Sequence, residues 1–246
     1  MSRPVVIIPA RLASQRLPGK ALAEIAGRPM IAHVIARARA AGAGPVWVAT
    51  DSTEIAGAAE AAGAAAVLTS SAHVSGSDRI AEALDKIDPG GLHDVVVNVQ
   101  GDEPQIEAAA IAAAVALMAE PAVDVGTLAT PAAPAEREDP DAVKLVGTEI
   151  APGRLRALYF TRAPAPWGEG PVLRHVGLYA WRRAALARFV ALPPSALEKR
   201  ERLEQLRALE AGMRIDAALV EEAARGVDTP ADLERVRGIL APEKKT

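Results

Sequence analysis

Three cations lie close together near the start of the chain, in a loop where an α/β protein can hold an anion. Arg11, Arg16 and Lys20 follow a short apolar run at residues 5–8 that predicts a first strand. The carboxyl end of such a strand exposes backbone N–H groups, and arginine and lysine add charge that can follow phosphate oxygens. The pattern predicts a nucleotide-binding loop, with a solvated basic turn as the common alternative for a short charge cluster.

Carboxylates that could hold a metal ion follow two other segments. Asp102 comes after residues 95–99, a β-branched run typical of a buried parallel strand. Mg²⁺ prefers oxygen ligands and takes one or two carboxylates from the protein, so Asp102 is the first choice as a ligand. An ordinary turn is an equally good interpretation of Gly101 and Asp102. Near the end of the chain, Asp228 or Thr229 could simply cap a predicted helix at residues 231–240.

Strands and helices alternate through the first half of the chain, which predicts parallel strands with crossover helices. Asp51 and Glu54 resemble a capping box at the start of one helix. The strands are expected at residues 5–8, 46–49, 66–69 and 95–99, with helices after Pro29, after Asp51 and from residue 80.

The second half is organised differently, with short β-like segments at residues 144–146, 155–160 and 176–181 between Pro- and Gly-rich turns. It predicts an added lobe. Arg162, Arg174 and His175 lie in or beside these segments and could clamp an acidic substrate, although a histidine beside an arginine is more often an ordinary hydrogen-bonded residue. A helix is predicted over residues 195–211, where Glu204 and Gln205 taken alone indicate a solvated face.

Composition narrows the class of protein. The chain has 246 residues, a formal net charge of −3, 3% aromatic residues and no cysteine, which excludes disulfides and thiolate chemistry. Basic and acidic residues are mixed throughout, so no nucleic-acid-binding face is expected. The opening apolar run is too short for a signal peptide, and residues 108–119 are too few to span a bilayer. We therefore expect a soluble, cytoplasmic protein with no membrane partner.

Eight motifs in order along the chain resemble the 3-deoxy-manno-octulosonate (Kdo) cytidylyltransferase family. They are VIIPAR at 6–11, SQRLPGK at 14–20, VATD at 48–51, SGSDR at 75–79, NVQGDEP at 98–104, RHVGLY at 174–179, LEQLR at 203–207 and GVDTP at 226–230. Any one of these strings is weak evidence, but together they extend over nearly the whole chain.

The resemblance implies a single α/β nucleotidyltransferase domain over residues 1–246, with a Rossmann-like, mostly parallel sheet of the nucleotide-diphospho-sugar transferase type. A smaller sugar-binding and dimerisation lobe would occupy about residues 130–200. The implied enzyme converts CTP and Kdo to CMP-Kdo and pyrophosphate with Mg²⁺, for lipopolysaccharide biosynthesis, as a homodimer.

The resemblance also implies roles for individual residues. The catalytic residues would be Lys20, Arg11, Asp102 and Asp228, and the last two would be the metal ligands. The nucleotide would be bound by Ala10, Arg11, Arg16, Lys20, Ser75, Gly76, Ser77, Arg79 and Gln100. The sugar would be bound by Gln100, Arg162, His175, Tyr179, Glu204 and Gln205.

Three other functions are weighed against this one. A cytidylyltransferase for another acidic sugar, such as 8-amino-Kdo or a nonulosonic acid, would share the nucleotide loop and the metal carboxylates. A regulatory module that binds a nucleotide without chemistry would lose a metal carboxylate, so the presence of both Asp102 and Asp228 argues against it. A purely structural α/β protein would not need three cations in the first loop, so this cluster argues against that function.

Overall fold

The computed structural model describes residues 2–13, 17–223 and 225–241, which pack into two compact units. Unit 1 contains the described residues within Met1–Pro4, His93–Val97 and Ala112–Ala223, and unit 2 contains those within Val5–Leu92, Asn98–Ile111 and Ala224–Thr246. Each unit therefore collects segments that are distant in the sequence. The predicted lobe at about residues 130–200 falls within unit 1, and its boundaries stay a prediction.

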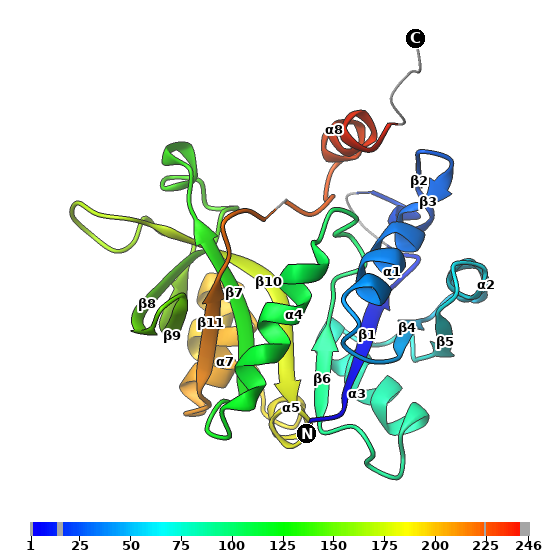
Figure 1. Ribbon diagram of the computed structural model, residues 1–246, viewed down its shortest axis with the longest axis horizontal. Helices are drawn as coiled ribbons and strands as arrows, with labels where there is room; N and C mark the ends of the chain where they lie inside the picture. The colour runs from blue at the N-terminus through cyan, green and yellow to red at the C-terminus, as the bar shows by residue number, and fades with distance from the viewer. Residues whose placement is uncertain (1, 14–16, 224, 242–246) are drawn as a thin grey trace. The chain divides into compact units, whose positions relative to one another are not determined.

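Unit 2 is built on three parallel strands in the order β5-β4-β1, which lie side by side in Figure 1. Four consecutive residues of β1 are buried, as expected of a parallel strand that is covered on both faces. The elements of this unit are β1 (Pro4–Ala10), η1 (Lys20–Leu22), β2 (Glu24–Ile25), β3 (Arg28–Pro29), α1 (Met30–Ala40), β4 (Val46–Thr50), α2 (Thr53–Ala61), β5 (Ala65–Leu68), α3 (Gly76–Ile87) and α8 (Pro230–Leu240). The predicted α/β class is confirmed.

Three helices of unit 2 begin at a side-chain cap, because the first N–H groups of a helix need an acceptor. Ser52 caps α2, Ser75 caps α3 and Thr229 caps α8. The predicted capping box of Asp51 and Glu54 is wrong: the cap lies one residue later, which leaves the Asp51 carboxylate available for other contacts. α3 also begins four residues before the predicted position, at its serine cap.

Unit 1 has the strand order β6-β10-β7-β11-β9-β8 and mixes both strand directions. β11 runs parallel to β7, whereas β10 with β7, β11 with β9 and β8 with β9 are antiparallel. The elements are β6 (Val95–Asn98), η2 (Leu117–Ala119), β7 (Val125–Pro131), η3 (Pro134–Glu136), β8 (Lys144–Ala151), β9 (Arg154–Thr161), β10 (Leu173–Arg182), α5 (Arg183–Val190), α6 (Ala196–Glu201), α7 (Gln205–Glu210) and β11 (Ile215–Leu219), and α4 (Ala108–Ala116) contributes residues to both units. β7 and β11 were not predicted.

The single helix predicted over residues 195–211 is wrong, because the structure has two short helices there, α6 and α7. Arg202 adopts a left-handed conformation with a φ of 55°, which ends α6. Leu203 and Leu206, which belong to the apolar stripe that suggested one helix, are nevertheless buried.

A buried aspartate in unit 1 is paired with two arginines. Asp216 of β11 is fully buried and accepts hydrogen bonds from Arg154 at 2.6 and 2.9 Å and from Arg214 at 2.9 and 3.0 Å. These arginines hold the pKa of the Asp216 carboxyl below its usual value, against the opposing effect of burial. Within the described ranges, no helix is both long and apolar enough to cross a membrane.

Candidate active site

A cavity of about 470 Å³ opens in unit 2 and is lined by most of the residues that were predicted to bind a nucleotide or a metal. It gathers segments from the end of β1, the first loop, the start of α3, the loop after β6 and the segment before α8. The predicted residues on its walls are Ala10, Arg11, Lys20, Ser75, Gly76, Arg79, Gln100, Asp102 and Asp228. Sequence reasoning missed Pro9, Ala21, His73, Val74 and Gly101.

Two predicted nucleotide-binding residues are not on these walls. Ser77 is 4% exposed and lies within the first turn of α3, so its side chain is buried. Arg16 lies outside the described residues.

Lys20 joins the two predicted metal-binding carboxylates. Its Nζ lies 2.6 Å from Asp102 Oδ2 and 3.1 Å from Asp228 Oδ1. Gly19 precedes it in a left-handed conformation, with a φ of 67°, and this turn starts the short helix η1 that carries the lysine. One cation therefore bridges carboxylates that are 82 and 208 residues away along the chain.

Backbone contacts hold the two carboxylate-bearing segments together. Val227 N–H donates to Asp102 O at 2.8 Å. A Cβ on Gly226 would lie 3.4 Å from the same carbonyl oxygen, which is ordinary van der Waals contact, so the approach of the two segments does not depend on this glycine. Because Thr229 is the cap of α8, the alternative of Asp228 as the cap is wrong.

The donor set agrees with a magnesium site. Asp102 and Asp228 both reach one positive group, Lys20 Nζ, which shows that their oxygens can serve a shared cation. Mg²⁺ typically takes one or two carboxylates and completes its shell with water and phosphate oxygens. Among the residues that the structure describes, no group of three or more His, Cys, Asp or Glu side chains could hold a metal by itself, so a metal here would need such additional ligands.

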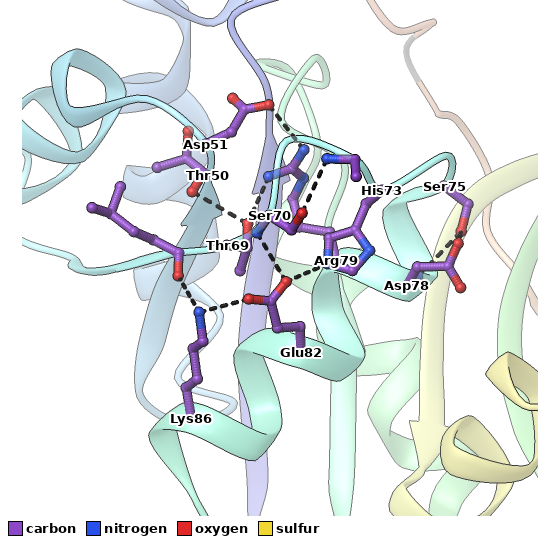
Figure 2. A network of polar contacts seen from close by, with 12 residues as sticks. Thr50, Asp51, Thr69, Ser70, His73, Ser75, Asp78, Arg79, Glu82 and Lys86 are labelled. Atoms are coloured by element: carbon purple, nitrogen blue, oxygen red, sulfur yellow. Dashed lines mark hydrogen bonds and ion pairs between the residues drawn. The ribbon is translucent and has the colours of Figure 1, made fainter.

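Arg79 is a buried cation on the cavity wall, and it is held by two acceptors (Figure 2). Its guanidinium donates to Thr69 Oγ1 at 2.6 Å and to Asp51 Oδ2 at 3.1 Å. The other oxygen of Asp51 accepts from Leu12 N–H at 3.2 Å. Asp51 thus connects the first loop with α3, a function that its interpretation as a helix cap concealed.

The loop after β6 approaches β1 closely. A Cβ on Gly101 would lie 2.9 Å from Pro9 O, a distance that real Cβ atoms essentially never show, so only glycine fits without movement. Gln100 Nε2 donates to Asn98 Oδ1 at 3.3 Å. Ala10, Gln100 and Gly101 all line the cavity.

His175, a predicted sugar-binding residue, lies in unit 1 and is buried. The hydroxyl of Thr127 donates to Leu178 O at 2.8 Å, so His175 Nε2–H donates to Thr127 Oγ1 at 2.9 Å. Burial, helped by Arg174, lowers the pKa of His175 from 6.5 to about 3. The expectation that His175 offers a positive charge to a carboxylate is therefore wrong, because its ring is neutral at physiological pH. Tyr179 lies beside it, with 5.5 Å between the ring centroids.

Arg162 stands at the end of β9 and is fixed by backbone acceptors. Its Nε donates to Glu201 O at 2.9 Å and its Nη1 to Pro140 O at 2.8 Å. The Glu201 carboxylate in turn accepts from Arg162 N–H and from Thr161 Oγ1, both at 2.9 Å. Glu201 was missed by sequence reasoning, since it carried no signal beyond a charge on a predicted helix.

The remaining predicted sugar-binding residues lie at the start of α7. Gln205 is 5% exposed, and Glu204 Oε1 lies 3.8 Å from Arg207 Nη2. The interpretation of both residues as a solvated helix face is wrong for Gln205, because the break at Arg202 turns this part of the chain inward.

Comparisons with known proteins agree with this geometry. The family model described as cytidylyltransferase matches residues 5–215. Proteins named 3-deoxy-manno-octulosonate cytidylyltransferase from Methylobacterium radiotolerans and Methylorubrum populi are each 64% identical to this chain, with 98% of both chains covered. A solved CMP:2-keto-3-deoxy-manno-octonic acid synthetase in complex with CTP is 40% identical over 97% of this chain and 98% of its own, with a TM-score of 0.90. This chain belongs to the 3-deoxy-manno-octulosonate cytidylyltransferase family, whose members are nucleotidyltransferases.

Proposed function

We propose that this protein transfers CMP from CTP to Kdo in a Mg²⁺-dependent reaction that yields CMP-Kdo and pyrophosphate. The observation that carries the proposal is the cavity in which Lys20 bridges Asp102 and Asp228, with Arg11 and Gln100 on the same walls. The names of the relatives, and the CTP in the solved neighbour, supply the choice of nucleotide and sugar.

The cationic side of the cavity would bind the triphosphate. Lys20 and Arg11 lie on its walls, and Gly76, the first residue of α3, places the N-terminus of this helix there. These groups would stabilise negative charge as it moves toward the leaving pyrophosphate. Gln100 and the segment at residues 75–79 would lie against the cytosine and ribose.

Asp102 and Asp228 would hold Mg²⁺. When bound, the ion would neutralise phosphate charge and lower the pKa of the attacking sugar hydroxyl. Lys20, which neutralises both carboxylates in this structure, would give way to the ion and contact the phosphates.

The reaction is a substitution at the α-phosphorus of CTP. The sugar hydroxyl oxygen forms a bond to phosphorus, the bond between phosphorus and the bridging oxygen of pyrophosphate breaks, and the hydroxyl proton passes to solvent. The protein contributes mainly positioning and charge neutralisation, as in other phosphoryl-type transfers.

Side chains of complementary types would bind the sugar, Gln100 among them. Arg162 would face the carboxylate of the sugar, and the neutral His175 would exchange hydrogen bonds with hydroxyl groups. The other residues proposed for the sugar are Tyr179, Glu204 and Gln205. We further propose that the enzyme acts as a homodimer in the cytoplasm and that its product serves lipopolysaccharide biosynthesis.

The test is pyrophosphate release by the purified protein with Mg²⁺, using CTP, UTP or ATP, each with and without Kdo. Release that requires CTP and Kdo together supports the proposal. Release with CTP and another acidic sugar, such as 8-amino-Kdo, but not with Kdo, would agree with the mechanism and refute the assignment of the sugar. No release with any pair would refute the proposed activity.

A further inference from the structure

The loop at residues 70–75 forms one rim of the cavity, and its shape depends on α3. It leaves the end of β5 and reaches the Ser75 cap, and it places His73, Val74 and Ser75 on the cavity walls. Val74 is 90% exposed, so apolar packing does not hold the middle of this loop. Polar contacts must therefore fix it.

Glu82, in the second turn of α3, supplies those contacts, as Figure 2 shows. Its Oε2 accepts from Ser70 N–H at 2.9 Å and from His73 Nε2. One carboxylate oxygen thus holds both a backbone group and a side chain of the loop. Glu82 is not on the cavity wall, so it reaches the site only through the loop.

Lys86 holds Glu82 in this position. Its Nζ lies 2.6 Å from Glu82 Oε1 and donates to Leu68 O, at the end of β5, at 2.8 Å. The contact with Lys86, followed by the Ser70 N–H bond, lowers the pKa of Glu82 to about 2. The carboxylate is therefore ionised throughout the range in which an enzyme works, and it remains a strong acceptor.

We propose that Glu82 is a positioning residue for CTP, which it serves by holding the rim at residues 70–75 in its binding conformation. The inference rests on the proposed function, because it takes the cavity as the CTP site. Without the negative charge, the hydrogen bonds from Ser70 N–H and His73 to residue 82 weaken, and the nucleotide itself must order the rim. The free-energy cost of ordering the rim then weakens the binding of CTP. It does not change the binding of the sugar or the rate of the chemical step.

The test compares the parent protein with Glu82→Gln and with Asp85→Asn as a matched control. Asp85 is an exposed carboxylate on the same helix, so its change removes an equal charge. We expect Glu82→Gln to raise the KM for CTP about tenfold, the loss expected for hydrogen bonds to a charged group, with kcat and the KM for the sugar nearly unchanged. Amide hydrogen exchange at residues 70–75 should become faster only in Glu82→Gln.

The outcomes separate the two proposals. A parent protein that releases no pyrophosphate refutes the proposed function, while amide exchange and the equilibrium Kd for CTP still test the role of Glu82. An unchanged KM or Kd for CTP in folded Glu82→Gln, or an equal rise in Asp85→Asn, overturns the inference. If circular dichroism shows that Glu82→Gln is unfolded, Glu82→Asp tests the same step, because its carboxylate is one methylene short of the loop.

Discussion

The neutral state of His175 makes the stability of the protein depend on pH in a predictable direction. The folded protein binds a proton at this ring only near pH 3, whereas the unfolded chain does so near the ordinary pKa of 6.5. Between these values the unfolded state holds more protons, so the free energy of unfolding must fall as the pH falls through this window. Stability attributed to His175 is thus fully present above pH 6.5 and is lost toward pH 3.

The size of the effect follows from the difference in pKa. A pH of 5 is 1.5 units below the unfolded-state pKa of 6.5. At 1.36 kcal/mol per unit, the free energy of unfolding falls by about 2 kcal/mol. A His175→Gln variant removes this loss, because an amide can still donate to Thr127 Oγ1 but does not titrate. The parent protein should therefore lose about 2 kcal/mol more than the variant between pH 7.5 and pH 5.

Urea unfolding at both pH values measures this difference, since urea does not change the charge of the protein. Tryptophan fluorescence reports on the same region, because the buried Trp181 lies on β10 with His175. The expected relative shift in midpoint is about 1 M urea. Equal losses in the two proteins would refute the reasoning and would mean that the folded protein protonates His175 near its ordinary pKa.

Three further outcomes are expected. Lys20→Met should lower kcat/KM in the pyrophosphate assay by about 10²- to 10³-fold, because it removes a fixed positive charge beside the phosphates, and an unchanged value would contradict its role. Asp228→Asn should lower turnover by about 10²-fold and raise the Mg²⁺ concentration needed for half-maximal rate, whereas full Mg²⁺-dependent turnover in the folded variant would rule out metal ligation. Gly126→Ala should lower the free energy of unfolding by about 1–3 kcal/mol, since its Cβ would lie 2.8 Å from Ala114 O, and a parent-like urea midpoint would show that the backbone yields without cost.

The sequence predicted the parallel half of the fold well, because its signals are local. The buried run in β1 and the spacing of apolar residues in α1 are visible without knowledge of distant contacts. β11 was missed for the opposite reason. Its second residue, Asp216, suggests an exposed position and is fully buried only because Arg154 and Arg214 pair with it.

The candidate site likewise contains residues that the sequence revealed and residues that it did not. The family motifs located the cations, Gln100 and the two aspartates that line the cavity, whereas the residues that support them were hidden. Asp51 resembled a helix cap, and Glu82 resembled any carboxylate on a helix surface. Their partners in the loops are 9 to 39 residues away, so only the folded chain reveals the contacts.

The bridge made by Lys20 also has a consequence for protein synthesis. Its two carboxylate partners are 82 and 208 residues farther along the chain. A ribosome that has added residue 102 has supplied one partner, but the second arrives only after the whole of unit 1 has been translated. Domains generally fold as the chain emerges, from the N-terminal end first. The strands of unit 2 can therefore form long before its acidic pair is complete, so a nascent or prematurely terminated chain carries the lysine and one aspartate without the second carboxylate of the bridge.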